Sequence, residues 1–228
     1  MNSLKNISIH AFKLFLWIIF NRIMVIPLFI SYMFITKKPG IMFQICLSVI
    51  CLILGLLSVK ILFNHYKKSL TLNNPMNFHT DLLNKDIKNW CKIIALTTVI
   101  LLGRYIFETH VIFSGNSNTN NTDSLLGSYT IPFFILLTLF GPICEEITVR
   151  GIFFSYFAIS NSIYNKFLLI FANGFLFMIL HGSILDVNAI MYFITGIILS
   201  VVFVAFKNIK YSIFMHVALN LIEGIFNF

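Results

Sequence analysis

Residues 129–158 read YTIPFFILLTLFGPICEEITVRGIFFSYFA. The stretch is longer than the roughly 20 mostly apolar residues that cross a bilayer, and Pro142 predicts that its helix is tilted or bent. Its centre nevertheless holds Glu145, Glu146 and Arg150. A charged side chain is costly in lipid unless it is paired or used, so the stretch predicts a membrane helix that carries a functional site.

The composition of the whole chain agrees with a membrane protein. Of its 228 residues, 58% are hydrophobic and 11% are charged, and the mean hydropathy is +0.91. Soluble domains have about 25% charged residues, so a soluble globular fold is disfavoured. The four cysteines (46, 51, 91 and 144) lack CxxC spacing, and we expect them to be small buried hydrophobes without disulfides.

Apolar segments of membrane-spanning length recur along the chain, and they predict an all-α transmembrane helix bundle with a polar cavity in the membrane. Seven segments qualify, at about 12–35, 41–63, 91–113, 129–158, 165–183, 187–206 and 210–227. The stretches at 64–90 and 114–128 are polar, and the first is expected to be a loop with or without a surface helix. Because the motifs begin after residue 128, we divide the chain into N-terminal spans at 1–128 and a helical core at 129–228.

The placement of lysine predicts the orientation of this bundle. With the N-terminus in the cytoplasm, the inner segments hold eleven lysines and the outer segments hold only Lys37 and Lys38, as the positive-inside rule requires. Topology and contact with anionic lipid account for the net charge of +8. The basic residues are dispersed, so no nucleic-acid partner is expected. The size and composition favour an integral protein of a bacterial plasma membrane, and the oligomeric state is left open.

The first polar pattern is Glu145-Glu146-x-x-x-Arg150. Glu146 and Arg150 are four residues apart and share a helix face, where they can pair, whereas Glu145 points about 100° away from Glu146. The two carboxylates can therefore take different partners and different roles. The alternative is a structural ion pair with a second glutamate at a water pocket.

Two further patterns place histidines in later apolar segments. His181 follows Phe177 by one helical turn, and Asn220 follows His216 by one turn, so each pair shares a face. A lone His181 is commonly a packing residue, and His216 with Asn220 can be an interhelical hydrogen-bonding pair. If the three membrane helices were straight, His216 would lie nearer the inner face than Glu145 and His181.

The combination of the three patterns is more specific than any one of them. Together they supply a carboxylate, a histidine base and two hydrogen-bond donors, which suffice for acyl hydrolysis by water without a serine or cysteine nucleophile. Glu145 with His181 would deprotonate the water. His216 and Asn220 would hold the oxyanion.

The three motifs resemble those of the CPBP family of CAAX proteases and bacteriocin-processing enzymes, also called the Abi or type II CAAX prenyl endopeptidase family. That family has EExxxR, FxxxH and HxxxN or a close variant, in this order, on transmembrane helices. The resemblance covers about residues 129–228. It implies an intramembrane endopeptidase with an eight-helix-like bundle, in which Glu145 and His181 activate water, His216 and Asn220 form the oxyanion site, and Glu146 and Arg150 complete the first motif.

Cofactors and substrate follow less directly. The family has been described both as metalloproteases and as glutamate-dependent proteases. Zinc held by His181, His216 and a glutamate is chemically possible, but we expect no obligatory metal, because Glu145 with His181 can activate water unaided. The expected substrate is a small peptide or a lipidated protein at the bilayer, as in maturation of a bacteriocin or signal peptide.

Two other function classes stay open at this point. The first is a bacteriocin self-immunity protein, which would act by binding or by proteolysis. Members of the family are similar to proteins with this role. The second is a transporter or channel, because intramembrane charge also marks ion pathways. Seven spans without inverted repeats fit that class poorly. Arg104 and Glu108 form an i, i+4 pair and are expected to be structural, and Arg22 is expected to snorkel or to cap a cavity.

Overall fold

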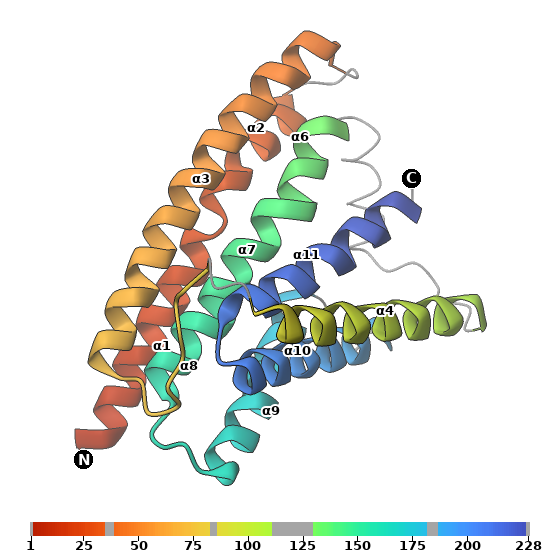
Figure 1. Ribbon diagram of the computed structural model, residues 1–228. Helices are drawn as coiled ribbons and strands as arrows, with labels where there is room; N and C mark the ends of the chain where they lie inside the picture. The colour runs from red at the N-terminus through yellow and green to blue at the C-terminus, as the bar shows by residue number, and fades with distance from the viewer. Residues whose placement is uncertain (1, 35–38, 83–85, 111–129, 182–186, 227–228) are drawn as a thin grey trace.

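The computed structural model describes residues 2–34, 39–82, 86–110, 130–181 and 187–226 (Figure 1). Within these ranges every regular element is a helix, which confirms the all-α prediction. The elements are α1 (Asn2–Phe20), η1 (Ile23–Val25), α2 (Ile26–Phe34), α3 (Ile41–Leu72), α4 (Ile87–His110), α6 (Thr130–Ile135), η2 (Leu136–Phe140), α7 (Gly141–Glu145), η3 (Glu146–Ile152), α8 (Phe153–Phe157), α9 (Ile163–His181), α10 (Val187–Phe206) and α11 (Ile209–Phe226).

Among the described residues, four helices are long and apolar enough to cross a membrane. They are Ile41–Leu72, Ile87–Ile106, Ile163–His181 and Ala189–Phe206, and they fall on the predicted spans at 41–63, 91–113, 165–183 and 187–206. The protein is therefore an integral membrane protein by the length and composition of its helices. The count of seven spans and the cytoplasmic N-terminus remain predictions.

The first predicted span, 12–35, is not one continuous helix. α1 ends at Phe20, and two turn residues and the 3₁₀ helix η1 separate it from α2. Pro27 contributes to this break, because it has no backbone N–H and its ring excludes the carbonyl four residues earlier. The interruption places two polar residues in the middle of an apolar segment, of which Asn21 is buried and Arg22 is exposed.

The predicted span at 129–158 is a single uninterrupted helical run from Thr130 to Phe157, built from α6, η2, α7, η3 and α8. The segments η2 and η3 are π-helical, with a backbone hydrogen bond from Gly141 N–H to the Leu136 carbonyl, five residues back. This wider turn lies directly before Pro142, where an α-helix would lose a hydrogen bond. The second π-helical segment contains Glu146 and Arg150.

The polar stretch at 64–90 differs from the expected loop. α3 continues to Leu72, and the described residues 73–82 fold back against the bundle. Met76 and Phe78 are only 1% and 4% exposed, and the Phe78 ring stacks on Phe203 with 4.2 Å between centroids. Two large apolar side chains inside a polar segment therefore anchor it to the core.

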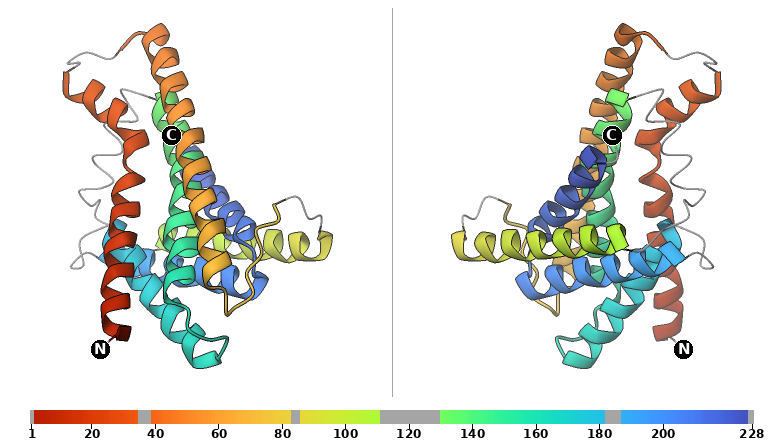
Figure 2. Two further views of the ribbon diagram at one scale, coloured as in Figure 1. Left: turned by 90° about the vertical axis from the view of Figure 1, so that its left-hand side faces the viewer. Right: turned by 90° about the vertical axis from the view of Figure 1, so that its right-hand side faces the viewer.

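The helices cross each other at steep angles instead of forming a parallel bundle. In Figures 1 and 2, α3 runs lengthwise beside the helical run α6–α8, whereas α4 and α10 run crosswise to them. α9 packs along α10, and α11 contacts α4, α10, α7 and η3. This crossing brings the end of α9 and the middle of α11 to the α7–η3 junction.

Candidate active site

Five of the six predicted site residues meet at the junction of α7 with η3. Glu145 is the last residue of α7, and Glu146 begins η3. α9 ends at His181, and α11 supplies His216. The ion pairs of the site divide these residues into two groups, one around each glutamate.

The group around Glu146 is completely buried. Oε1 of Glu146 lies 2.9 Å from Nη1 of Arg150 and 2.9 Å from Nδ1 of His216, and both Glu146 and Arg150 have 0% exposed side chains. An ionised carboxylate only accepts hydrogen bonds, so the His216 Nδ1 carries a hydrogen and donates it. The predicted pairing of Glu146 with Arg150 is present, and His216 joins it from another helix.

The Arg150 guanidinium has two further contacts. Its Nη2 donates to the carbonyl of Gly196 on α10 at 3.4 Å, and its central carbon lies 4.3 Å from the centre of the Phe177 ring, a cation–π geometry. α10 approaches this closely because Gly196 faces Gly174 of α9; a Cβ built on Gly196 would lie 2.9 Å from the Gly174 Cα. Small residues at such crossings allow backbones to meet in membrane proteins.

The group around Glu145 is accessible. Nε2 of His181 lies 3.4 Å from Oε2 of Glu145, and their side chains are 22% and 18% exposed. The separation exceeds the usual N–H···O distance of about 2.7–3.2 Å. Glu145 and Glu146 are neighbours in sequence, but they take different partners in different environments, as their helical angle predicts.

The other nitrogen of His181 fixes how this pair handles protons. Nδ1 lies 2.9 Å from the Phe177 carbonyl, which can only accept, so Nδ1 is the donor. A neutral imidazole has one N–H, so Nε2 then presents a lone pair toward Glu145. A proton held by the pair can be shared between Oε2 of Glu145 and Nε2 of His181.

Aromatic rings hold His181 on both sides. Phe177 stacks on it with 4.0 Å between centroids, and Tyr192 of α10 stacks on it with 5.2 Å. Phe177 also meets the His216 ring edge-on at 5.6 Å. One phenylalanine therefore contacts both groups of the site. The sequence places Phe177 in the second motif but gives it no role, and it offers no signal for Tyr192.

A buried asparagine that the motifs do not include supports the π-helical segment. Asn173 of α9 is 0% exposed; its amide donates to the Val149 carbonyl, and its Oδ1 accepts from Ser200 Oγ at 2.8 Å. The hydrogen bond to Val149 joins α9 directly to the backbone of the π-helical segment η3, and such a bond contributes about 0.5–1.5 kcal/mol. Asn173 precedes Phe177 and His181 by one and two turns on the same helix, a spacing that could have identified it.

The N-terminal region also reaches the site. Asn21 Nδ2 donates to the Cys144 carbonyl at 3.4 Å, and Thr148 Oγ1 donates to Asn21 Oδ1 at 3.1 Å. The break between α1 and η1 is thereby fastened to the helix that carries both glutamates. This contact links the region at 1–128, which has no motif, to the motif-bearing core.

The remaining predicted site residue is Asn220, one turn beyond His216 on α11 and half-buried. The expected difference in depth between His216 and Glu145 is not observed, because His216 contacts the neighbouring Glu146. α11 begins at Ile209 and slants across the helical run α6–α8 (Figure 1). The position of a residue along α11 therefore does not give its depth in the membrane as it would in a straight, upright helix.

Metal ligation is not indicated by the arrangement of the described side chains. Among them, no three His, Cys, Asp or Glu residues are grouped so that they could hold one ion. His181 and His216 each face a different glutamate. The expectation of a site without an obligatory metal remains a prediction.

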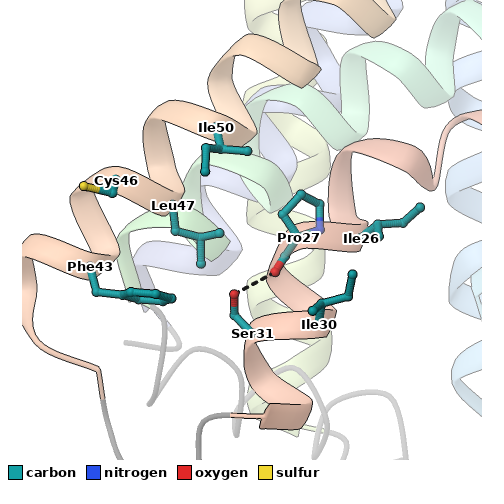
Figure 3. Close-up of a pocket in the computed structure, with 8 residues that line it drawn as sticks. All are labelled: Ile26, Pro27, Ile30, Ser31, Phe43, Cys46, Leu47 and Ile50. Atoms are coloured by element: carbon teal, nitrogen blue, oxygen red, sulfur yellow. Dashed lines mark hydrogen bonds between the residues drawn. The ribbon is translucent and has the colours of Figure 1, made fainter.

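A groove of about 420 Å³ lies elsewhere, between α2 and α3 (Figure 3). Its lining is apolar apart from Ser31, whose hydroxyl donates to the Pro27 carbonyl at 2.8 Å. The lining residues are Ile26, Pro27, Ile30, Ser31, Phe43, Cys46, Leu47 and Ile50. None of them belongs to the groups around Glu145 and Glu146. A polar cavity in the membrane remains a prediction.

Comparison with known proteins points to a class of membrane protease. Residues 127–222 match the family model described as Type II CAAX prenyl endopeptidase Rce1-like. The match covers less than half of the chain but includes all three motifs, and it confirms the resemblance expected from them. It supports a CAAX-type protease embedded in the membrane. None of the curated proteins and none of the solved structures compared with the chain matches it.

Proposed function

We propose that the protein is an intramembrane endopeptidase that hydrolyses a peptide bond of a small peptide or membrane-associated substrate with water activated by Glu145 and His181. The observation that carries this proposal is the accessible Glu145–His181 pair, with Nε2 3.4 Å from Oε2, beside a fully buried Glu146–Arg150 pair. A purely structural role explains the Glu146–Arg150 pair, but it does not explain the partly exposed Glu145–His181 pair.

The hydrolysis begins with a water molecule at the Glu145–His181 pair. The pair accepts a proton from the water, and the resulting hydroxide attacks the carbonyl carbon of the scissile bond. The same proton is returned to the amine as the carbon–nitrogen bond breaks. The Phe177 carbonyl and the two stacked rings hold His181 in the orientation that this transfer requires.

The oxyanion of the tetrahedral intermediate requires hydrogen-bond donors, and we assign this role to His216 and Asn220. Nδ1 of His216 donates to Glu146, so Nε2 becomes a donor only when the imidazole binds a second proton. The adjacent Glu146 carboxylate stabilises that cation, and Arg150 holds the carboxylate in place. In this account Glu146 and Arg150 position His216.

Bacterial origin and a bacteriocin or signalling-peptide substrate are part of the proposal. Prenylated CAAX proteins are unexpected substrates in a bacterium, whereas small secreted peptides are processed at its plasma membrane. The resemblance to CPBP proteins supports this substrate class.

The proposal is tested by comparing the peptides released by cells that express the wild type and Glu145→Ala at equal membrane levels. Asp81→Ala, which removes an exposed carboxylate, is the matched control. A peptide or new terminus that is present with the wild type and the control but absent with Glu145→Ala would support proteolysis. Identical peptide profiles, together with unchanged protection against a bacteriocin, would favour an immunity protein that acts by binding.

A further inference from the structure

Arg22 is a positive charge in the middle of an apolar segment, and the proposed mechanism does not use it. It lies ten residues into the apolar stretch 12–35, which corresponds to roughly 15 Å of helix and about half the thickness of a hydrocarbon core. An arginine at such a depth is expected to have a partner or a function. Its side chain is exposed, and among the described residues no carboxylate forms an ion pair with it.

The neighbouring residue ties the break that carries Arg22 to the helix that carries Glu145. Asn21 is hydrogen-bonded to the carbonyl of Cys144 and to Thr148, so the break that exposes Arg22 is held against the residues on both sides of Glu145. Glu145 is paired with His181, and Arg22, the residue that follows Asn21, has an exposed side chain at this contact between the break and the glutamate helix.

The nature of the missing partner follows from this position. A guanidinium binds carboxylate and phosphate groups through two parallel hydrogen bonds. The phosphates of bilayer lipids lie at the membrane surfaces, whereas Arg22 lies near the centre of its apolar segment. An anion that arrives together with a peptide bond at Glu145 is a carboxylate of the peptide itself.

We infer that Arg22 binds a carboxylate of the peptide substrate and so determines which bonds reach the Glu145–His181 pair. This assignment rests on the proposed endopeptidase function. The carboxylate is either the C-terminus of the peptide or an acidic side chain near the scissile bond, and both present the same group to the guanidinium. Arg22 takes no part in the proton transfers and acts as a specificity-determining residue.

The assignment is tested with the purified full-length protein in lipid nanodiscs and a synthetic peptide library of mixed sequence. The library is prepared in two forms, one with a free C-terminal carboxylate and one with a C-terminal amide, and cleavage is followed by mass spectrometry. The wild type is expected to favour the free carboxylate in kcat/KM by about tenfold to a hundredfold, the usual range for a charged hydrogen bond. Arg22→Gln removes this preference, and Arg22→Lys retains part of it. Lys60→Gln, which removes an exposed cation on α3, is the control and should keep the preference for the free carboxylate.

The alternative carboxylate gives a different pattern in the same experiment. If the two forms are cleaved equally but cleavage favours sequences with Asp or Glu near the scissile bond, and Arg22→Gln removes that preference, the ligand is an acidic side chain. Equal loss of activity on all peptides in Arg22→Gln, or an unchanged preference, overturns the assignment while Glu145-dependent cleavage persists. Absence of any Glu145-dependent cleavage overturns the proposed function and this assignment with it.

Discussion

Glu145 and Glu146 are adjacent in the chain, yet the surroundings of their carboxylates differ in almost every respect. Glu146 is enclosed by Arg150 and His216, with no exposed surface on its side chain. Glu145 faces His181 at a longer distance in a pair that is about one fifth exposed. Both carboxylates lie in an apolar helical run, so burial in the membrane alone does not decide their roles.

The comparison shows how one helix can place two adjacent charges in different environments. The helical angle between consecutive residues separates the two carboxylates, and the partners supplied by α9 and α11 then give them different environments. The buried pair is neutralised by its own ion pair and contacts His216. The side chains of the Glu145–His181 pair are partly exposed. Each of the following variants removes a contact of either the Glu145 group or the Glu146 group.

His181→Gln is expected to have the largest effect on activity. The change removes the base that shares a proton with Glu145, and the loss of this general acid–base catalysis corresponds to about a hundredfold to ten-thousandfold in turnover. Peptide release by the purified protein measures it. His10→Gln, which alters a histidine that contacts Tyr156 far from the site, is the control. Comparable losses in both variants would contradict the assignment.

Arg150→Met is expected to act on stability. It leaves the buried Glu146 carboxylate without its counter-charge and with only the His216 hydrogen bond, and breaking a buried ion pair costs about 3–5 kcal/mol of unfolding free energy. Unfolding in mixed micelles measures the change, and the double variant Glu146→Gln/Arg150→Met should recover most of it. If the single variant unfolds like the wild type, Glu146 is not held as a buried ion pair.

Asn173→Ala is expected to have an intermediate effect. It removes the hydrogen bond to the Val149 carbonyl, a loss of about 0.5–1.5 kcal/mol, and it loosens the π-helical segment that positions Arg150, so turnover falls as well. Asn165→Ala is the matched control, because Asn165 is also buried and accepts hydrogen bonds from the backbone amides of Ile159 and Ser160 outside the site. Both variants should be destabilised, but only Asn173→Ala should lose turnover in the fraction that remains folded.

Tyr192→Leu is expected to have the smallest effect. A stacked aromatic pair contributes about 0.5–1.5 kcal/mol, so removing one of the two rings around His181 should lower turnover by a few-fold. Tyr192→Phe keeps the ring and should retain most of the activity. Equal losses in both variants would assign the effect to the tyrosine hydroxyl instead of the stacking.

The sequence predicted the contacts that depend on spacing within one helix. The i, i+4 relation of Glu146 to Arg150 and the angular separation of Glu145 from Glu146 follow from 3.6 residues per turn, and both are present. The all-α class followed from long apolar segments. These predictions needed no knowledge of how separate helices pack.

Contacts between helices were less accessible to prediction. That His216 meets Glu146 depends on the slant of α11, which the sequence does not encode locally. Phe177 contacts residues of both charged groups only because three helices converge on it. The break at Asn21 and the burial of Phe78 also depend on partners that are distant in the sequence. The sequence around each residue therefore does not show whether its side chain is buried or exposed.

The most direct test of the division between the two glutamates is a parallel measurement of unfolding and turnover for Glu145→Gln and Glu146→Gln. Both variants are isosteric and remove one charge from adjacent positions. We predict that Glu145→Gln unfolds at the wild-type midpoint without measurable turnover, whereas Glu146→Gln, which leaves Arg150 buried without its counter-charge, unfolds earlier. A Glu145→Gln protein that cleaves peptides at the wild-type rate, or that is destabilised as much as Glu146→Gln, would contradict this account.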